Sequence, residues 1–136
     1  MTRFVGVGLT AVLALTLGCQ PGIEIPELGE VNGTVTVDGK PLEGVAVTFV
    51  PESGALASVA RTGSDGKYEL LYAVPGAKQM IKGAALGQHT VRIDILPDPL
   101  AQTASQPLPA RYNIESALTA DVKSGPNTFD FQVTSR

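Results

Sequence analysis

The sequence contains no tryptophan, and its 136 residues include a single cysteine, Cys19, and a single histidine, His89. A lone cysteine cannot form a disulfide within the chain or build a cysteine-based metal cluster. A zinc site normally takes several histidine or cysteine ligands, which this sequence does not offer. These scarcities exclude most enzyme chemistries, so we expect no catalytic residue, no metal site and no cofactor.

Charge is also scarce and nearly balanced. The chain has 10 basic and 13 acidic residues, which gives a formal net charge of −3. This balance provides no electrostatic basis for binding nucleic acid or an anionic bilayer surface. Glycine and proline, in contrast, are abundant at 15 and 10 residues. They favour short strands joined by turns over helices.

The first eighteen residues follow the three-part plan of an export signal. Arg3 provides a basic end, residues 4–17 form an apolar run, and Gly18 is a small residue at the cut site. The run is too short to span a bilayer comfortably, because a transmembrane helix takes about 20 residues. Residues 1–18 are therefore predicted to be a signal peptide, and the protein is predicted to be exported.

The end of this run, LTLGC at residues 15–19, resembles the lipobox of bacterial lipoproteins. The resemblance implies that Cys19 carries a diacylglyceryl group and, after cleavage, a fatty acyl chain such as palmitate. Thr16 departs from the family preference for leucine. An ordinary signal peptide with a free Cys19 thiol and an uncleaved anchor remain alternatives. Lipid would hold the domain at a membrane outside the cytoplasm, and Gln20, where some inner-membrane lipoproteins have aspartate, favours the outer membrane.

The rest of the chain divides into a tether and one domain. Residues 19–29 are rich in proline and glycine without a hydrophobic period, which predicts a flexible tether. From residue 30, apolar and polar side chains alternate, which is typical of a half-buried strand. Further strands are predicted at residues 44–50, 56–62, 68–72, 89–96, 118–122 and 128–134. About seven strands with turns between them predict an all-β domain, an antiparallel β-sandwich over residues 30–136.

Alternation also predicts which side chains of these strands face the core. The inward side chains are predicted to include Val31, Val35, Val45, Val47, Phe49, Tyr68, Leu70, Tyr72, Val91, Ile93, Phe129, Phe131 and Val133.

Two stretches between the predicted strands lack this alternation. Residues 74–87 are ambiguous, because their glycines favour a loop while a helical turn at residues 78–81 is an alternative. Residues 97–109 hold four prolines and predict a long exposed loop, the candidate contact for a partner.

Ordered motifs along the domain resemble the carboxypeptidase regulatory-like domains. They are VNGTVTVDGKPLEGVAVTFVP at residues 31–51, TGSDGKYEL at 62–70 and GAALGQHTVRI at 83–93. PARY at residues 109–112 and SALTADV at 116–122 are similar to the tail of bacterial lipoprotein versions of this domain. The resemblance implies a transthyretin-like (prealbumin-like) sandwich without catalytic activity of its own. In the peptidases the catalytic domain is separate, and nothing in this sequence corresponds to it.

Three polar residues are candidates for a site. His89 would serve as a general base or metal ligand, but the chain has no second histidine, and a structural or surface role is favoured. Asp38 and Asp65 each precede a glycine in a turn and are candidate calcium ligands. Calcium takes six to eight oxygens, and neither turn has regularly spaced acids. Aspartates that bond to their own turn are therefore the favoured interpretation.

Two classes of function remain. The first is an interaction or structural module at the cell envelope, with an unidentified protein partner and no nucleic acid. The second is a small-ligand or carbohydrate-binding module on the same sandwich. Tyr68, Tyr72 and Tyr112 are the candidates for stacking on sugars, although the first two share the inward parity of Leu70. Exposed aromatic side chains would favour the second class, and open sheet edges would favour the first.

Overall fold

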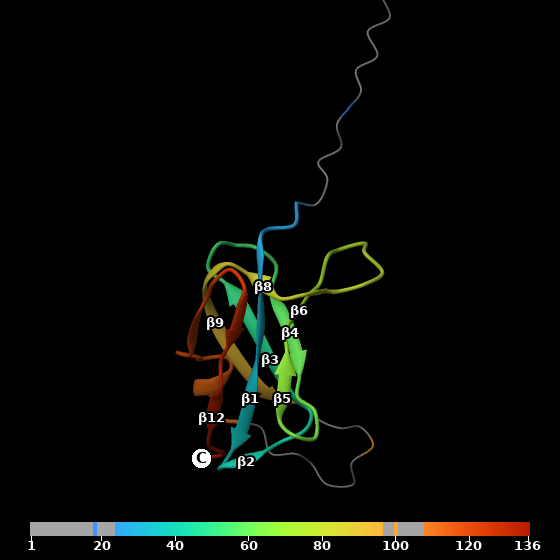
Figure 1. Cartoon of the computed structure of the whole chain (residues 1–136). Coiled ribbons are helices and arrows are strands. Elements are labelled where there is room, and N and C mark those ends of the chain that lie inside the picture. Colours follow the sequence, from blue (N-terminus) through green and yellow to red (C-terminus); the bar gives the residue numbers. More distant parts are fainter. Residues whose placement is uncertain (1–17, 19–23, 97–99, 101–107) are drawn as a thin grey trace, which may run out of the picture.

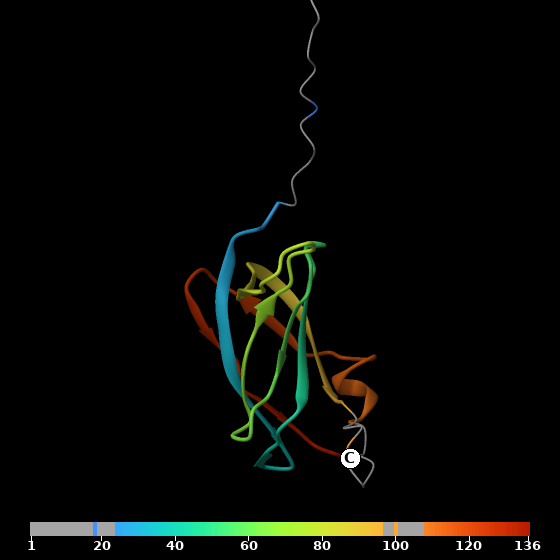
Figure 2. The ribbon, with the colours of Figure 1, turned by 90° about the vertical axis from the view of Figure 1, so that its right-hand side faces the viewer.

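A computed structural model describes residues 18, 24–96, 100 and 108–136 of the chain. Within these residues, twelve strand segments form two sheets that pack face to face as a sandwich. Figure 2 shows the two layers edge-on, with β1 (Leu28–Val37) in one layer and β3 (Val45–Pro51) in the other. The predicted all-β sandwich is confirmed.

The first layer, called sheet 1, is built around β1. β2, β5 and β8 pair with β1 in antiparallel orientation, whereas β11 and β12 pair with it in parallel. The parallel pairs bring the last strands of the chain beside the first, an arrangement that the sequence pattern did not indicate. The bounds of these segments are Lys40–Pro41 (β2), Lys67–Glu69 (β5), Ala84–Ala85 (β8), Pro126–Thr128 (β11) and Phe131–Val133 (β12).

The second layer, called sheet 2, has the strand order β10-β9-β3-β4-β6-β7, and its pairs are antiparallel. Its centre is the pair of β3 with β9, which runs in register from Val45 opposite Ile95 to Pro51 opposite His89. The bounds of its remaining segments are Ser58–Arg61 (β4), Leu71–Tyr72 (β6), Ile81–Lys82 (β7), Gly87–Ile95 (β9) and Thr119–Val122 (β10).

The predicted strand at residues 68–72 belongs to both sheets. Its first part, β5, pairs with β1, and its second part, β6, pairs with β4. Leu70 lies at the crossing, where its N–H donates to Val31 O (2.9 Å) and its carbonyl accepts from Gly83 N (2.8 Å). One continuous segment therefore joins the two sheets on this side of the sandwich.

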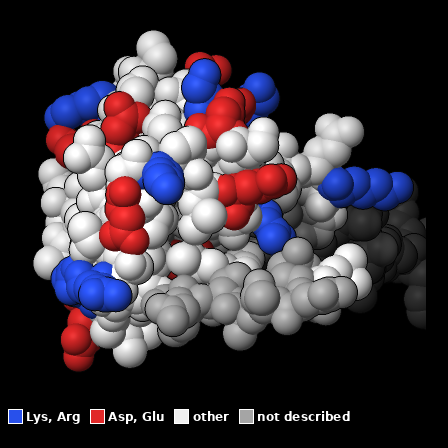
Figure 3. Space-filling view, turned by 90° about the horizontal axis from the view of Figure 1, so that it is seen from below, with Lys and Arg blue, Asp and Glu red and all other residues white. Residues whose placement is uncertain are grey.

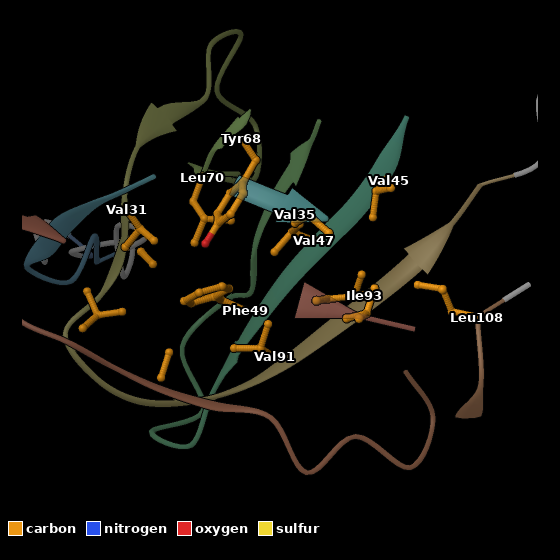
Figure 4. Close-up of a cluster of buried hydrophobic side chains, with 14 residues drawn as sticks. Val31, Val35, Val45, Val47, Phe49, Tyr68, Leu70, Val91, Ile93 and Leu108 are labelled. Carbon is orange, nitrogen blue, oxygen red and sulfur yellow. The ribbon is translucent and has the colours of Figure 1, made fainter. Parts of the chain in front are cut away.

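The core lies between the sheets and follows the predicted alternation. Val31 and Val35 of β1 face Val47 and Phe49 of β3, and all four side chains are almost fully buried. Figure 4 shows Phe49 in the middle of the labelled cluster. Its ring centroid lies 5.9 Å from that of Phe129 and 6.2 Å from that of Phe131. An aromatic group thus packs at the centre of the sandwich.

The predicted last strand, residues 128–134, is divided. β11 begins at Pro126, between the strands predicted at residues 118–122 and 128–134, and β12 begins at Phe131. Between them, the carbonyl of Phe129 lies against Gly33, where an added Cβ atom would be 1.8 Å from that oxygen. The predicted inward parity holds for Val133, which is buried, while Phe129 and Phe131 pack against the core but stay partly exposed.

The segment at residues 74–87 contains strand segments where a helical turn was an alternative. Residues 78 and 79 form bends, and Ile81 begins β7, so the helical turn at residues 78–81 is not formed. Among the described residues the helical structure is one 3₁₀ turn, Ala110–Tyr112. None of the helices in the described part of the chain is long and apolar enough to cross a bilayer.

The ends of the domain lie at opposite poles of the sandwich. Figure 1 shows the amino-terminal segment entering at the top of β1 and the carboxyl end at the bottom, near β2. β1 itself begins at Leu28, which pairs with Ala85, so the first ordered strand starts two residues before residue 30. At about 3.3 Å per residue, its ten residues run about 30 Å from one pole to the other.

Candidate functional site

His89 belongs to the core of the sandwich. It is 1% exposed, and its ring centroid lies 5.7 Å from that of Phe49. Its Nδ1 is 2.9 Å from Gly87 O. Because a carbonyl only accepts, Nδ1 carries the proton, and the opposite nitrogen, Nε2, is buried without a hydrogen-bond partner among the described residues. The structural role favoured from sequence is thus the one its surroundings support.

Burial lowers the pKa of His89 below its usual value, because the charged imidazolium would lose its hydration; the Gly87 carbonyl, Asp121 and Glu52 oppose this effect. We therefore expect stability to be complete above pH 6.5, the unfolded-state pKa, and to fall as the pH drops toward the lower folded-state pKa. The slope for one proton is at most about 1.4 kcal/mol per pH unit.

Urea unfolding of the full chain between pH 7.5 and 5.5 measures this slope. The His89→Gln variant serves as the control, because it removes the titrating group while keeping a polar side chain at the same place. We expect the wild type to lose stability over this range and the variant to lose less. Parallel curves for the two proteins would contradict the assignment.

The two turn aspartates have different roles. Asp65 Oδ1 accepts from Lys67 N at 3.1 Å, so the prediction that it bonds to its own turn is confirmed. Asp38 instead bonds to Ser135, accepting from its N–H at 3.0 Å and its hydroxyl at 2.6 Å. These hydrogen bonds lower the pKa of the Asp38 carboxyl. In the described residues no cluster of three or more acidic, histidine or cysteine side chains is positioned to hold a metal ion.

The remaining candidates are Cys19, the predicted loop at residues 97–109 and the three tyrosines. Cys19 lies outside the described residues, and so does most of the predicted loop at residues 97–109. Tyr68 and Tyr72 are each 3% exposed and face the core as predicted. Tyr112 lies at the surface, where the guanidinium carbon of Arg111 is 4.8 Å from its ring centroid. The tyrosines therefore do not gather into an exposed platform for a sugar ring.

A different feature, an open groove, lies on the outer surface where β1 and β5 of sheet 1 approach β4 and β6 of sheet 2. Its volume is about 890 Å³. We call it the outer groove, and it is lined by Asn32, Gly33, Thr34, Ala60, Arg61, Lys67, Tyr68, Glu69, Leu71, Thr128 and Asp130. A second depression of about 170 Å³ shares Asn32 and Glu69 with it and extends to Lys82. The groove therefore continues along the junction of β1 and β5.

The side chains of the outer groove are placed by strand alternation. Asn32 and Thr34 occupy outward positions of β1, and Lys67 and Glu69 occupy outward positions of β5. The pairing of β1 with β5 sets Asn32 opposite Glu69 and Thr34 opposite Lys67. Residues two apart on a strand lie about 6.6 Å apart on the same face, so this pairing produces a small array of polar groups.

Hydrogen bonds fix several groups around the groove. The Thr128 hydroxyl donates to Asn32 Oδ1 at 3.1 Å, and Asp130 Oδ1 accepts from Thr34 N at 2.9 Å. Beneath them, the Tyr68 hydroxyl donates to Phe129 O at 2.6 Å. Burial, with a smaller contribution from the negative charge of Asp130, raises the pKa of Tyr68 well above its usual value, so this hydroxyl remains a donor.

Charges of both signs are present at the pole opposite the tether. Figure 3, which views the molecule from that pole, shows acidic and basic side chains intermixed among neutral ones. Such a face produces no strong field of one sign that would attract a polyanion such as nucleic acid.

No protein-family model matches this sequence, and no curated protein matches it. Among solved structures, the chain is similar to a DUF3823 family protein from Parabacteroides merdae ATCC 43184, at 13% sequence identity and a TM-score of 0.42. The likeness covers 82% of this chain and 48% of that one. The chain thus spans about half the length of the solved protein.

Proposed function

We propose that this protein is a non-catalytic binding module, held at a membrane by lipid on Cys19, that contacts an envelope partner through the outer groove. The observation that carries the proposal is the groove itself, a hollow of about 890 Å³ on the outer surface of the sandwich. Its polar side chains are supplied by regular strands, and sites on such rigid elements hold their geometry well.

The position of the tether supports this use of the groove. Eight residues lie between Cys19 and Leu28, and an extended chain spans at most about 3.6 Å per residue, or about 30 Å here. β1 then leads away from the tether toward the opposite pole, as Figure 1 shows. Asn32 and Thr34 lie in the middle of this strand. With such a tether extended, the proposed lipid anchor would leave the groove clear of a bilayer surface and open to a partner.

The same proposal includes the family: we propose that this domain is a carboxypeptidase regulatory-like domain. The ordered motifs at residues 31–51, 62–70 and 83–93 resemble carboxypeptidase regulatory-like domains, and a two-sheet sandwich is the architecture that this resemblance implies. Such domains have no catalytic activity of their own. The burial of His89 away from the outer groove supports the same conclusion, because a general base has to reach a substrate.

The test places a photo-crosslinking amino acid at Thr34 in the groove and, as a matched control, at Thr90 on the outer face of sheet 2. We expect a discrete adduct from Thr34 in the membrane fraction of native cells and no such adduct from Thr90. In Cys19→Ser, the protein is expected to leave the membrane fraction or accumulate as a precursor.

Two results would contradict the proposal separately. Identical adducts from both positions, or none from Thr34, would exclude the groove as the contact surface. A wild-type protein that is soluble and whose intact mass shows an unmodified Cys19 thiol would exclude the lipid tether. The predicted loop at residues 97–109 remains a further candidate contact, and the same crosslinker placed at Leu100, which is 90% exposed, reports on it.

Small-ligand binding is a second candidate, favoured by the size of the groove. Sites for small molecules commonly measure about 300–1,000 Å³, and the outer groove falls within this range at about 890 Å³. Stacking on sugar rings does not support this candidate, because Tyr68 and Tyr72 are buried. A small ligand would instead be held by charge and hydrogen bonds.

A further inference from the structure

The charged side chains that line the outer groove differ in how well they are paired. Glu69 Oε1 lies 2.8 Å from Lys82 Nζ, and Asp130 accepts the hydrogen bond from Thr34 N. Arg61 and Lys67, in contrast, have no ion pair or side-chain hydrogen bond to the part of the chain that the structure describes. The groove therefore presents two basic groups that are not held in an ion pair.

The charges around the groove are balanced in number but not in pairing. Arg61 and Lys67 line it together with Glu69 and Asp130, and Lys82 and Glu30 both line the adjoining depression. Three basic and three acidic groups leave no net charge, so what distinguishes Arg61 and Lys67 is that neither is held in an ion pair, whereas Lys82 is. The ion pair with Glu69 raises the pKa of Lys82, which keeps this lysine charged and its carboxylate partner engaged.

The guanidinium of Arg61 lies beside Gly44, which directly precedes the neighbouring strand β3. A Cβ atom added to Gly44 would be at ordinary contact distance, 3.4 Å from Nη2 and 3.7 Å from Nε of Arg61. Gly44 itself does not line the groove, whereas Arg61 does. The guanidinium carries a planar fork of donors that matches a carboxylate or phosphate.

The neutral side chains of the groove complement an anion that also bears hydroxyl groups. Asn32 uses its carbonyl oxygen to accept from Thr128, so its amide group is left to donate. The Thr34 hydroxyl lies on the same outward face of β1, and Asp130 has a second carboxylate oxygen that can accept from a hydroxyl. Donors and acceptors thus lie beside the two unmatched basic groups.

We infer that the outer groove binds a small ligand that carries a carboxylate or phosphate group and several hydroxyl groups, with its anionic group held by Arg61 and Lys67. This inference rests on the small-ligand candidate above and specifies its chemical class. The anion takes the place of the missing acidic partner, and the hydroxyl groups lie over Asn32, Thr34 and Asp130. Binding weakens as salt rises, because the two basic groups are exposed.

The experiment titrates the full chain, labelled with ¹⁵N and purified in detergent, with matched pairs of sugars followed by NMR. Galacturonate is compared with galactose, and glucose 6-phosphate with glucose, so that each pair differs in the anionic group. We expect a saturable shift of the amide signals of Asn32, Thr34, Lys67 and Thr128 with at least one acidic member. Its neutral counterpart is expected to bind about tenfold more weakly.

Variants then assign the anion to its partners. Arg61→Gln and Lys67→Gln are each expected to weaken binding of the acidic sugar about tenfold. Lys40→Gln is the matched control, because Lys40 is exposed on β2 and does not line the groove. All three sites are exposed, and the dispersion of the NMR spectrum verifies that each variant is folded.

The possible outcomes separate this inference from the proposed function. A carboxylate-only or a phosphate-only response identifies which anion the groove takes, and both support the inference. Equal binding of the neutral and acidic sugars overturns the role of the anion while ligand binding stands. No saturable shift with any of the four, or binding insensitive to Arg61→Gln and Lys67→Gln, overturns the inference. Crosslinking from Thr34 still tests the contact surface independently.

Discussion

Replacing Phe49 with alanine is expected to lower the free energy of unfolding by about 3–5 kcal/mol, the usual loss for a buried phenylalanine. Phe49 is 0% exposed, and its ring contacts His89, Phe129 and Phe131. The substitution removes the central ring and leaves a cavity that strands from both sheets cannot easily fill. Urea unfolding at pH 7.5, where His89 is neutral, measures the loss.

The neighbouring residue provides the control for Phe49→Ala. Val50 follows it on β3 but points to the outer face and is 38% exposed. Val50→Ala is therefore expected to change stability by less than about 1 kcal/mol, because little buried surface is lost. If the two variants lost similar stability, the packing of β3 between the sheets would be wrong.

Phe49 also illustrates what strand alternation allows a sequence to predict. Val45, Val47 and Phe49 were predicted to share the inward face of one strand, and all three are fully buried. A period of two is a local property of an extended backbone, so it can be recognised without knowing which strands are neighbours. For this reason the strands and the composition of the core could be predicted closely.

Depth of burial depends on more than alternation. Phe131 has the inward parity that was predicted, yet it remains partly exposed because β12 pairs with β1 at a boundary of sheet 1. Alternation gives the direction of a side chain, whereas the number of strands beside it decides how much of it is covered. The covered fraction of a side chain is therefore set by contacts between residues that are far apart in the sequence.

The outer groove could not be predicted for the same reason. Its lining comes from residues 32–34, 60–61, 67–69, 71, 128 and 130, which meet through the pairing of β1 with β5 and β11 and of β4 with β6. The bond from Ser135 to Asp38 likewise joins residues 97 positions apart. The available signal was that polar side chains recur at outward positions of the predicted strands, which did not reveal that these positions converge.

The second large effect is expected at Gly33, in the middle of β1. An added Cβ would lie 1.8 Å from Phe129 O, 2.7 Å from Phe129 C and 2.9 Å from the Tyr68 ring, much closer than atoms can approach. Gly33→Ala is therefore expected to cost about 3 kcal/mol or more, at or above the upper end for overpacking, because a backbone carbonyl has to move. Urea unfolding measures the loss.

The size and sign of this effect distinguish it from the general influence of glycine. Alanine normally stabilises a strand by up to about 1 kcal/mol relative to glycine, because it restricts the unfolded chain. Gly63→Ala is the matched control, since its added Cβ would meet only Asp65 Oδ1, at 3.4 Å, and we expect a change within about 0.5 kcal/mol. A comparably small change in Gly33→Ala would mean that Phe129 does not approach β1 as described.

A large loss in Gly33→Ala alone supports the parallel placement of β11 and β12, because Phe129 N donates to Asn32 O (2.9 Å) directly beside Gly33. The same displacement would carry Asp130 away from Thr34, so the stability of this junction and the shape of the outer groove depend on the same missing side chain.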